Sequence, residues 1–112
     1  MSRSTVILFR ISKDGFNKRV SASVDAAGAL AVASYAFDTE GYDREFDLAV
    51  AAEHMPAFRS ALGLPSSVGA DELLAELQAR FNTLRCDGEL ADFVRQHGIE
   101  VTQSAYTRYP DR

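Results

Sequence analysis

The amino-acid sequence predicts an α+β domain, a mainly antiparallel sheet of four to five strands with three helices packed on one face, in the order ββββαααβ. Apolar residues recur at about every second position as far as Val50 and at a spacing of about 3.6 residues after Met55. Short turns join the strand-like segments, and connections this short can join only antiparallel neighbours. The 112 residues, 46% of them hydrophobic, are enough for one domain over residues 1–112.

Turn residues separate the four strands of the first half. Asp14-Gly15 and Gly28 are typical of hairpin turns, because glycine adopts the positive φ that these turns require. The run Val6-Ile7-Leu8-Phe9 is apolar at every position, which predicts a first strand that is covered on both faces and lies centrally in the sheet. The strands are expected over residues 5–12, 18–24, 29–37 and 42–50.

The second half has the spacing of helices, followed by one more strand. Pro56 suits a first helical turn, and Gly63 and Gly98 are placed to end helices. Leu84 is expected on the buried side of the second helix, and Asp87 as the N-cap of the third. These elements are expected over residues 53–63, 70–84, 87–97 and 100–106, with the last strand beside the first or the central strand and residues 106–112 as a flexible tail.

Two features of the sequence indicate the compartment. No run of 18 or more apolar residues occurs, and Met1-Ser2-Arg3-Ser4 leads directly into the first predicted strand, so we expect neither a membrane span nor a secretory signal. Cys86 is the single cysteine, which excludes an intrachain disulfide and favours a reducing cytoplasm.

For each side chain that could act in catalysis, a structural role is the simpler interpretation. Cys86 precedes a predicted helix, whose N-terminus could lower the thiol pKa, but with no assignable base or oxyanion site a partly buried apolar role is favoured. His97, just before Gly98, suits a helix C-terminus, and His54 an exposed position near a helix start. There is no histidine pair at metal spacing and no glycine-rich phosphate loop. We therefore expect no enzymatic activity, no catalytic residue, no metal and no cofactor.

Charge is divided unevenly along the chain. Residues 1–25 have a net charge of +3 and residues 26–54 a net charge of −5, within a total of −4. An acidic centre repels phosphate and attracts basic proteins. The third predicted helix begins Asp87-Gly88-Glu89, which does not suit DNA recognition either. Nucleic acid is therefore not an expected partner.

The candidate partner-binding residues lie in the fourth predicted strand and in the turn before it. The carboxylates of that strand share one face, but alternate residues are about 7 Å apart and do not converge on one metal ion. Tyr42 is the expected aromatic anchor. The alternative interpretation is a solvated strand face that only discourages pairing with other chains. The candidates are Asp38, Glu40, Tyr42, Asp43, Glu45 and Asp47.

One succession of segments covers most of the chain and consists of helix stops and core positions. It runs through the Gly28 hairpin, Tyr42 and Phe46, the segment from Val50 to Pro56, Leu62-Gly63, Leu73-Leu74, Arg80-Phe81, Phe93 and His97-Gly98-Ile99. Together these segments resemble a group of small bacterial α+β proteins of unassigned function, some of which are similar to the immunity proteins that accompany toxins. The resemblance implies a bacterial protein that binds and neutralises a toxin domain.

The sequence therefore predicts a non-enzymatic protein-binding module of the cytoplasm. The most specific form of this prediction is an immunity-type protein that binds a basic toxin domain through the acidic strand. Two alternatives remain open. One is a structural or regulatory homo-oligomer, a homodimer for example, formed through an exposed sheet edge. The other is a small-ligand-binding domain.

Overall fold

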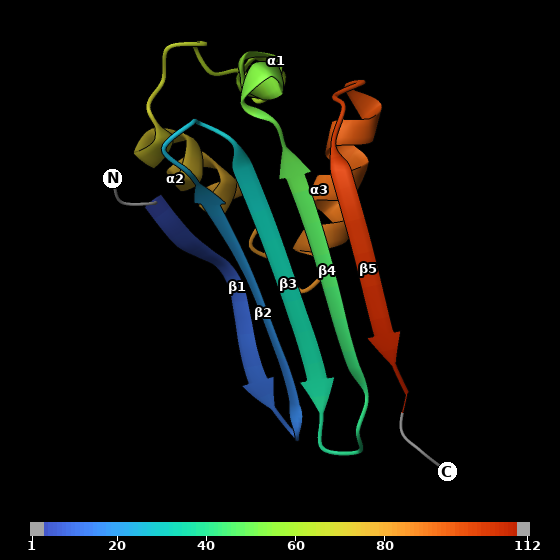
Figure 1. The fold of residues 1–112 in the computed structure, drawn as a ribbon. Helices are drawn as coiled ribbons and strands as arrows, with labels where there is room; N and C mark the ends of the chain where they lie inside the picture. Colours follow the sequence, from blue (N-terminus) through green and yellow to red (C-terminus); the bar gives the residue numbers. More distant parts are fainter. Residues whose placement is uncertain (1–3, 110–112) are drawn as a thin grey trace.

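The computed structural model describes residues 4–109 and contains one five-stranded antiparallel sheet with helices behind it (Figure 1). The strands follow one another across the sheet in the order β1-β2-β3-β4-β5. The α+β class and the order ββββαααβ are confirmed. The elements are β1 (Ser4–Lys13), β2 (Phe16–Val24), β3 (Leu30–Asp38), β4 (Asp43–Val50), the 3₁₀ turn η1 (Ala52–His54), α1 (Met55–Ala61), α2 (Ala70–Arg80), α3 (Cys86–Gln96) and β5 (Thr102–Arg108).

The first strand is an edge strand, so the prediction of a central strand covered on both faces was wrong. A β-bulge at Leu8 explains the continuous apolar run. Ile7 pairs with Ser21 and Phe9 with Val20, which leaves Leu8 as the extra residue. The bulge turns both Leu8, only 3% exposed, and Phe9 towards the helices. The run of four apolar residues therefore results from a change of register between β1 and β2.

The last strand pairs with β4, not with the first or the central strand as predicted. It forms the second edge of the sheet and continues to Arg108. Residues 106–108 therefore belong to the sheet and not to the expected tail, and residues 110–112 lie outside the described residues. The mistake has a physical cause, because β5 has no buried alternation that would have indicated its length or its neighbour.

Two helices end at the predicted glycines, and two details of the helical half were wrong. Gly63 and Gly98 have φ values of 78° and 65°, and the amide of Ile99 donates to the carbonyl of Val94 at 2.9 Å. The second helix ends at Arg80, and Leu84, 47% exposed, lies in the following loop. Asp87 is not the N-cap but the second residue of α3, after Arg85 at the cap position.

The helices leave the other face of the sheet open. In Figure 1 they lie behind one half of the strands, and the other ends of the strands extend past them. The described chain is accordingly elongated, 50 × 26 × 23 Å. The core lies between the helices and the covered part of the sheet, where its largest fully buried side chains are Phe58, Leu30, Leu48, Met55, Leu73, Leu74, Leu77 and Leu90.

Candidate functional site

The open face of the sheet is the candidate site, and its register arranges the side chains in rows that run across all five strands. Alternate residues of each strand point to this face, and the ladder aligns them with their neighbours. One row consists of Arg10, Arg19, Tyr35, Glu45 and Tyr106. The next row consists of Ser12, Asn17, Phe37, Asp43 and Arg108.

Small side chains predominate in the two other rows of the open face, with Ile7 and Asp47 as the exceptions. They lie on the half of the sheet that has the helices behind it. These rows are Ile7, Ser21, Ala33, Asp47 and Ser104, and then Thr5, Ser23, Ala31, Ala49 and Thr102. The bulky and charged residues are therefore concentrated on one half of the face.

The structure brings three of the six predicted partner-binding residues to the open face. Asp43, Glu45 and Asp47 lie there in consecutive rows of β4, while Phe46, Leu48 and Val50 are buried against the helices. The Arg108 side chain reaches towards one of them, with its Nε 3.8 Å from Asp43 Oδ2. The alternation predicted for this strand is confirmed, and its use as a binding surface stays a prediction.

The other three predicted residues belong to the turn between β3 and β4. Asp38 is a turn-forming residue, because its Oδ1 accepts hydrogen bonds from the amides of Glu40 at 2.9 Å and Tyr42 at 3.1 Å. Glu40 is exposed in this turn. The ring of Tyr42 packs against that of Tyr109, with centroids 5.9 Å apart. Tyr42 therefore lies in the turn before β4, with its ring against Tyr109.

The aromatic residues of the open face are ones that the sequence analysis did not single out. Tyr35, Phe37 and Tyr106 are 42%, 39% and 54% exposed. The rings of Tyr35 and Phe37 lie 5.2 Å apart on the central strand. Their signal was present in the sequence, since both fall at the outward positions of β3 in the alternation Ala31, Ala33, Tyr35, Phe37.

A shallow hollow of about 450 Å³ lies beside these two rings, towards β1 and β2. Arg10 and Arg19 face each other across the ladder at its border. Among residues 4–109, neither guanidinium lies within ion-pair distance of a carboxylate. Directly opposed like charges repel each other, so a negatively charged group bound at this border would be stabilised.

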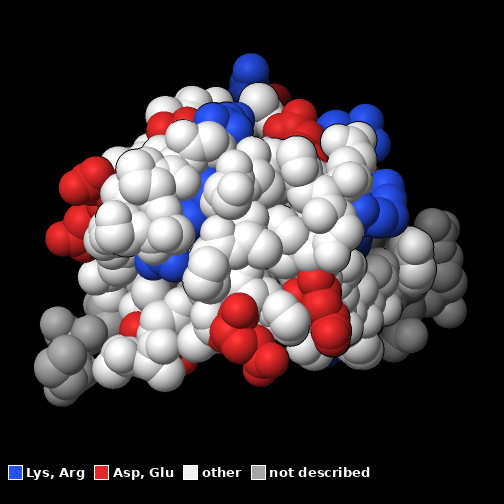
Figure 2. Space-filling view, turned by 90° about the horizontal axis from the view of Figure 1, so that it is seen from above, with Lys and Arg blue, Asp and Glu red and all other residues white. Residues whose placement is uncertain are grey.

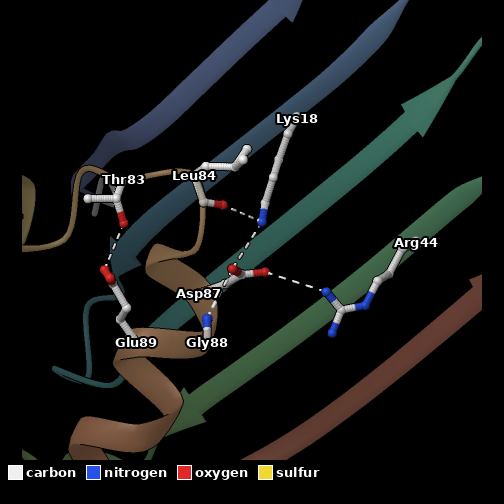
Figure 3. Close-up of polar contacts among 7 residues, drawn as sticks. All are labelled: Lys18, Arg44, Thr83, Leu84, Asp87, Gly88 and Glu89. Atoms are coloured by element: carbon white, nitrogen blue, oxygen red, sulfur yellow. Dashed lines mark hydrogen bonds and ion pairs between the residues drawn. The ribbon is translucent and has the colours of Figure 1, made fainter.

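On the covered side of the sheet, the carboxylate of Asp87 joins α3 to two strands (Figure 3). Lys18 Nζ donates to Asp87 Oδ1 at 3.1 Å and to the carbonyl of Leu84 at 2.7 Å. The amide of Gly88 donates to the same Oδ1 at 3.0 Å, and Arg44 Nη1 lies 4.0 Å from Oδ2. Burial opposes ionisation, but Lys18, through its hydrogen bond and charge, brings the pKa of Asp87 below its ordinary value of 3.8.

The predicted roles of the cysteine and the histidines can be compared with their positions. Cys86 is fully buried, and burial first, then the charge of Asp87, raises its pKa to about 11, so the thiol is protonated at neutral pH. His97 ends α3 with its ring 4.5 Å from that of Phe93. His54 stands just before α1, with Nε2 3.8 Å from Glu100 Oε2. Within residues 4–109, no three His, Cys, Asp or Glu side chains are grouped to hold a metal ion.

The end of the molecule seen in Figure 2 has acidic and basic side chains in small separate groups. It therefore offers no large surface of one sign. None of the helices in the described part of the chain is long and apolar enough to cross a membrane.

The open face is thus a surface of exposed aromatic rings with arginines on β1 and β2 and carboxylates on β4. Such an arrangement can bind a partner by apolar contact and charge. Comparisons of the chain with protein-family models, curated proteins and solved structures found no match.

Proposed function

We propose that this chain is a non-enzymatic protein-binding module whose open sheet face holds a partner protein. The observation that carries the proposal is the exposure of Tyr35, Phe37 and Tyr106 in adjacent rows of that face. Exposed apolar groups rimmed by charge are typical of interaction sites, and tyrosine is among the residues that contribute most to binding energy.

The sharper form of the proposal is an immunity-type role in a bacterial cytoplasm, in which the module neutralises a basic toxin domain. The carboxylates of Asp43, Glu45 and Asp47 support it, because all three point outwards beside the aromatic rings. Basic side chains of a toxin would meet these carboxylates, and the rings would supply the apolar contact. The single cysteine supports a reducing compartment.

Charge reversal on β4 tests the proposal. The tagged wild-type protein and the variant D43K/E45K/D47K are used to capture proteins from a lysate of the source cells at low and high salt. We expect the wild type to retain a basic protein at low salt and to lose it at high salt, and the variant to lose it at both.

The matched control is E72K/E89K/D92K, which changes the net charge equally at exposed residues of α2 and α3, behind the sheet. It should retain the partner. Equal capture by the wild type and by D43K/E45K/D47K would remove the open face from consideration, provided that circular dichroism shows both proteins folded.

A further inference from the structure

Two opposite charges of the open face, Arg19 and Glu45, lie too far apart to pair within one chain. Arg19 and Glu45 belong to one row, but Tyr35 on the central strand stands between them. Strands are about 4.8 Å apart, so the two side chains start about 10 Å from each other. Within residues 4–109, neither of them forms an ion pair. The arginines of β1 and β2 and the carboxylates of β4 therefore lie on opposite sides of one aromatic strand.

We propose that the open face binds a second copy of this chain, face to face, about a two-fold axis that runs along β3. This inference rests on the proposed function in one respect, that the open face is the interaction surface. Rotation about an axis parallel to the strands keeps each row at its own level and exchanges the two halves of the sheet. Strand β2 of one copy then lies over β4 of the other.

The register sets which side chains meet in this dimer. Arg19 of each copy faces Glu45 of the other, and Asn17 faces Asp43. Ser21 faces Asp47 of the second copy, so each of the three carboxylates has a cation or a hydrogen-bond donor opposite it. The central rings of Tyr35 and Phe37 lie on the axis and meet their own counterparts. No like charges are opposed.

The hollow provides a second, independent fit. It lies over β1 and β2 and is bordered by Arg10, Arg19, Tyr35 and Phe37. The same rotation places β5 of the second copy above β1, so Tyr106, the most exposed aromatic of the open face, lies over this hollow. Its ring there meets the guanidinium of Arg10, an arrangement that favours cation–π contact. Each copy thus contributes one projecting ring, that of Tyr106, and one hollow that receives the Tyr106 ring of the other copy.

Charge also selects this orientation over the other two-fold arrangement. An axis that runs across the strands would place β4 on β4, with the three carboxylates of one copy against those of the other. It would also leave Arg10 and Arg19 without a counter-charge. Such like-charge contacts are destabilising and suppress the wrong arrangement.

The size of the face matches a weak, reversible dimer. Five strands about 4.8 Å apart and four rows about 7 Å apart give a face of about 650 Å² per copy. Standard interfaces bury about 800 Å² per partner, and smaller ones belong to transient complexes. Because two of the rows consist mostly of small residues, the bulky side chains of the other two rows make most of the contact, and we expect dissociation in the micromolar range.

Analytical ultracentrifugation of two charge variants tests the dimer. We expect the wild type to pass from the 12.3 kDa monomer to twice that mass between about 1 and 500 μM. R19E and E45R should each remain monomeric, because each opposes like charges twice across the axis. An equimolar mixture of the two should restore the doubled mass, since both contacts in the mixed dimer are then between opposite charges. The matched control E72R, on α2, should behave as the wild type.

Three results would overturn the inference: a wild type that is monomeric throughout, a mixture of R19E and E45R that stays monomeric, or a dimer that persists in each variant alone. The last result would indicate pairing through an edge such as β5. The two proposals fail separately. A monomeric wild type whose basic partner is lost in D43K/E45K/D47K leaves the proposed function standing. If the mixture of R19E and E45R dimerises but D43K/E45K/D47K still captures the basic partner, only the dimer is supported.

Discussion

Asp87 is a residue whose ionisation is coupled to folding. It is 4% exposed, and Lys18 from β2 holds its carboxylate against the first turn of α3. Because the folded state lowers the pKa of Asp87 below 3.8, the unfolded state binds the proton at a higher pH than the folded state. The stabilisation is therefore complete above that value and is lost as the pH falls through the pKa of the folded state.

Replacement of Asp87 by asparagine should reveal this coupling. At pH 7, D87N should lower the free energy of unfolding by about 1.5–3 kcal/mol, the usual contribution of a hydrogen bond to a charged group. The difference from the wild type should shrink as the pH falls from 3.8 to the lower pKa of the folded state, below which the wild-type carboxylate is neutral in both states. Urea unfolding at several pH values measures both effects.

The control for this substitution is D92N, at an exposed position of the same helix. It should change stability little at any pH. A loss in D87N that stays constant down to low pH would show that packing, and not the charge of Asp87, is responsible.

At the scale of the element, replacement by alanine should destabilise the protein at Gly63 and stabilise it at Gly88. Gly63 ends α1 with a φ of 78°, and a Cβ there would meet no neighbour, so G63A should cost about 1–2 kcal/mol through backbone strain alone. Gly88 lies inside α3 with open space around it, so G88A should stabilise the protein by up to about 1 kcal/mol. Thermal unfolding of the two variants measures this contrast, and a shift of the midpoint in the same direction for both would contradict it.

Elements were predictable where local chemistry decides their form. Asp14 and Gly15 both have positive φ, as an Asp-Gly hairpin turn requires, and the alternation of β4 identified its buried and outward faces. The position of β1 was not predictable in the same way, because a bulge and a doubly covered strand produce the same apolar run. The partner of β5 was not predictable either, since pairing between distant segments depends on the whole sheet.

The candidate site shows the same limit. The outward carboxylates of β4 follow from period two within one strand, and they were found. The rows that join them to Tyr35, Tyr106 and Arg19 depend on the register of four ladders, which no single segment encodes. Tyr42 was chosen because it is next to the acidic strand in the sequence, but its ring packs against Tyr109.

At the scale of the molecule, the sheet is longer than the layer of helices that supports it (Figure 1). Side chains of β2 from Val20 to Val24 alternate between buried and partly exposed, whereas the residues from Phe16 to Arg19 are partly or fully exposed. Stability against local opening follows the density of buried apolar contacts. The two ends of the same strand should therefore differ in stability.

Native-state hydrogen exchange can compare these ends. At about 1 μM protein, where the monomer prevails, the hydrogen-bonded amides of residues 20–24 should exchange at least ten-fold more slowly than those of residues 16–19. Raising the concentration should slow exchange at the second group if the open faces meet. Equal rates at both ends in the dilute protein would mean that the sheet opens as one unit.

The bulge at Leu8 also limits how this sheet can grow. A regular edge strand presents unpaired amides and carbonyls to which a further strand can bind, and a bulge disrupts their regular spacing. Strand β1 has the bulge, and the side chain of Gln78 donates to the carbonyl of Ile7 beside it at 2.9 Å, whereas β5 pairs without interruption from Thr102 to Arg108. A chain with one receptive edge can join a second chain at that edge, but the pair presents only bulged edges outwards. Fibre growth by strand addition needs two receptive edges, so the bulge on β1 opposes such growth.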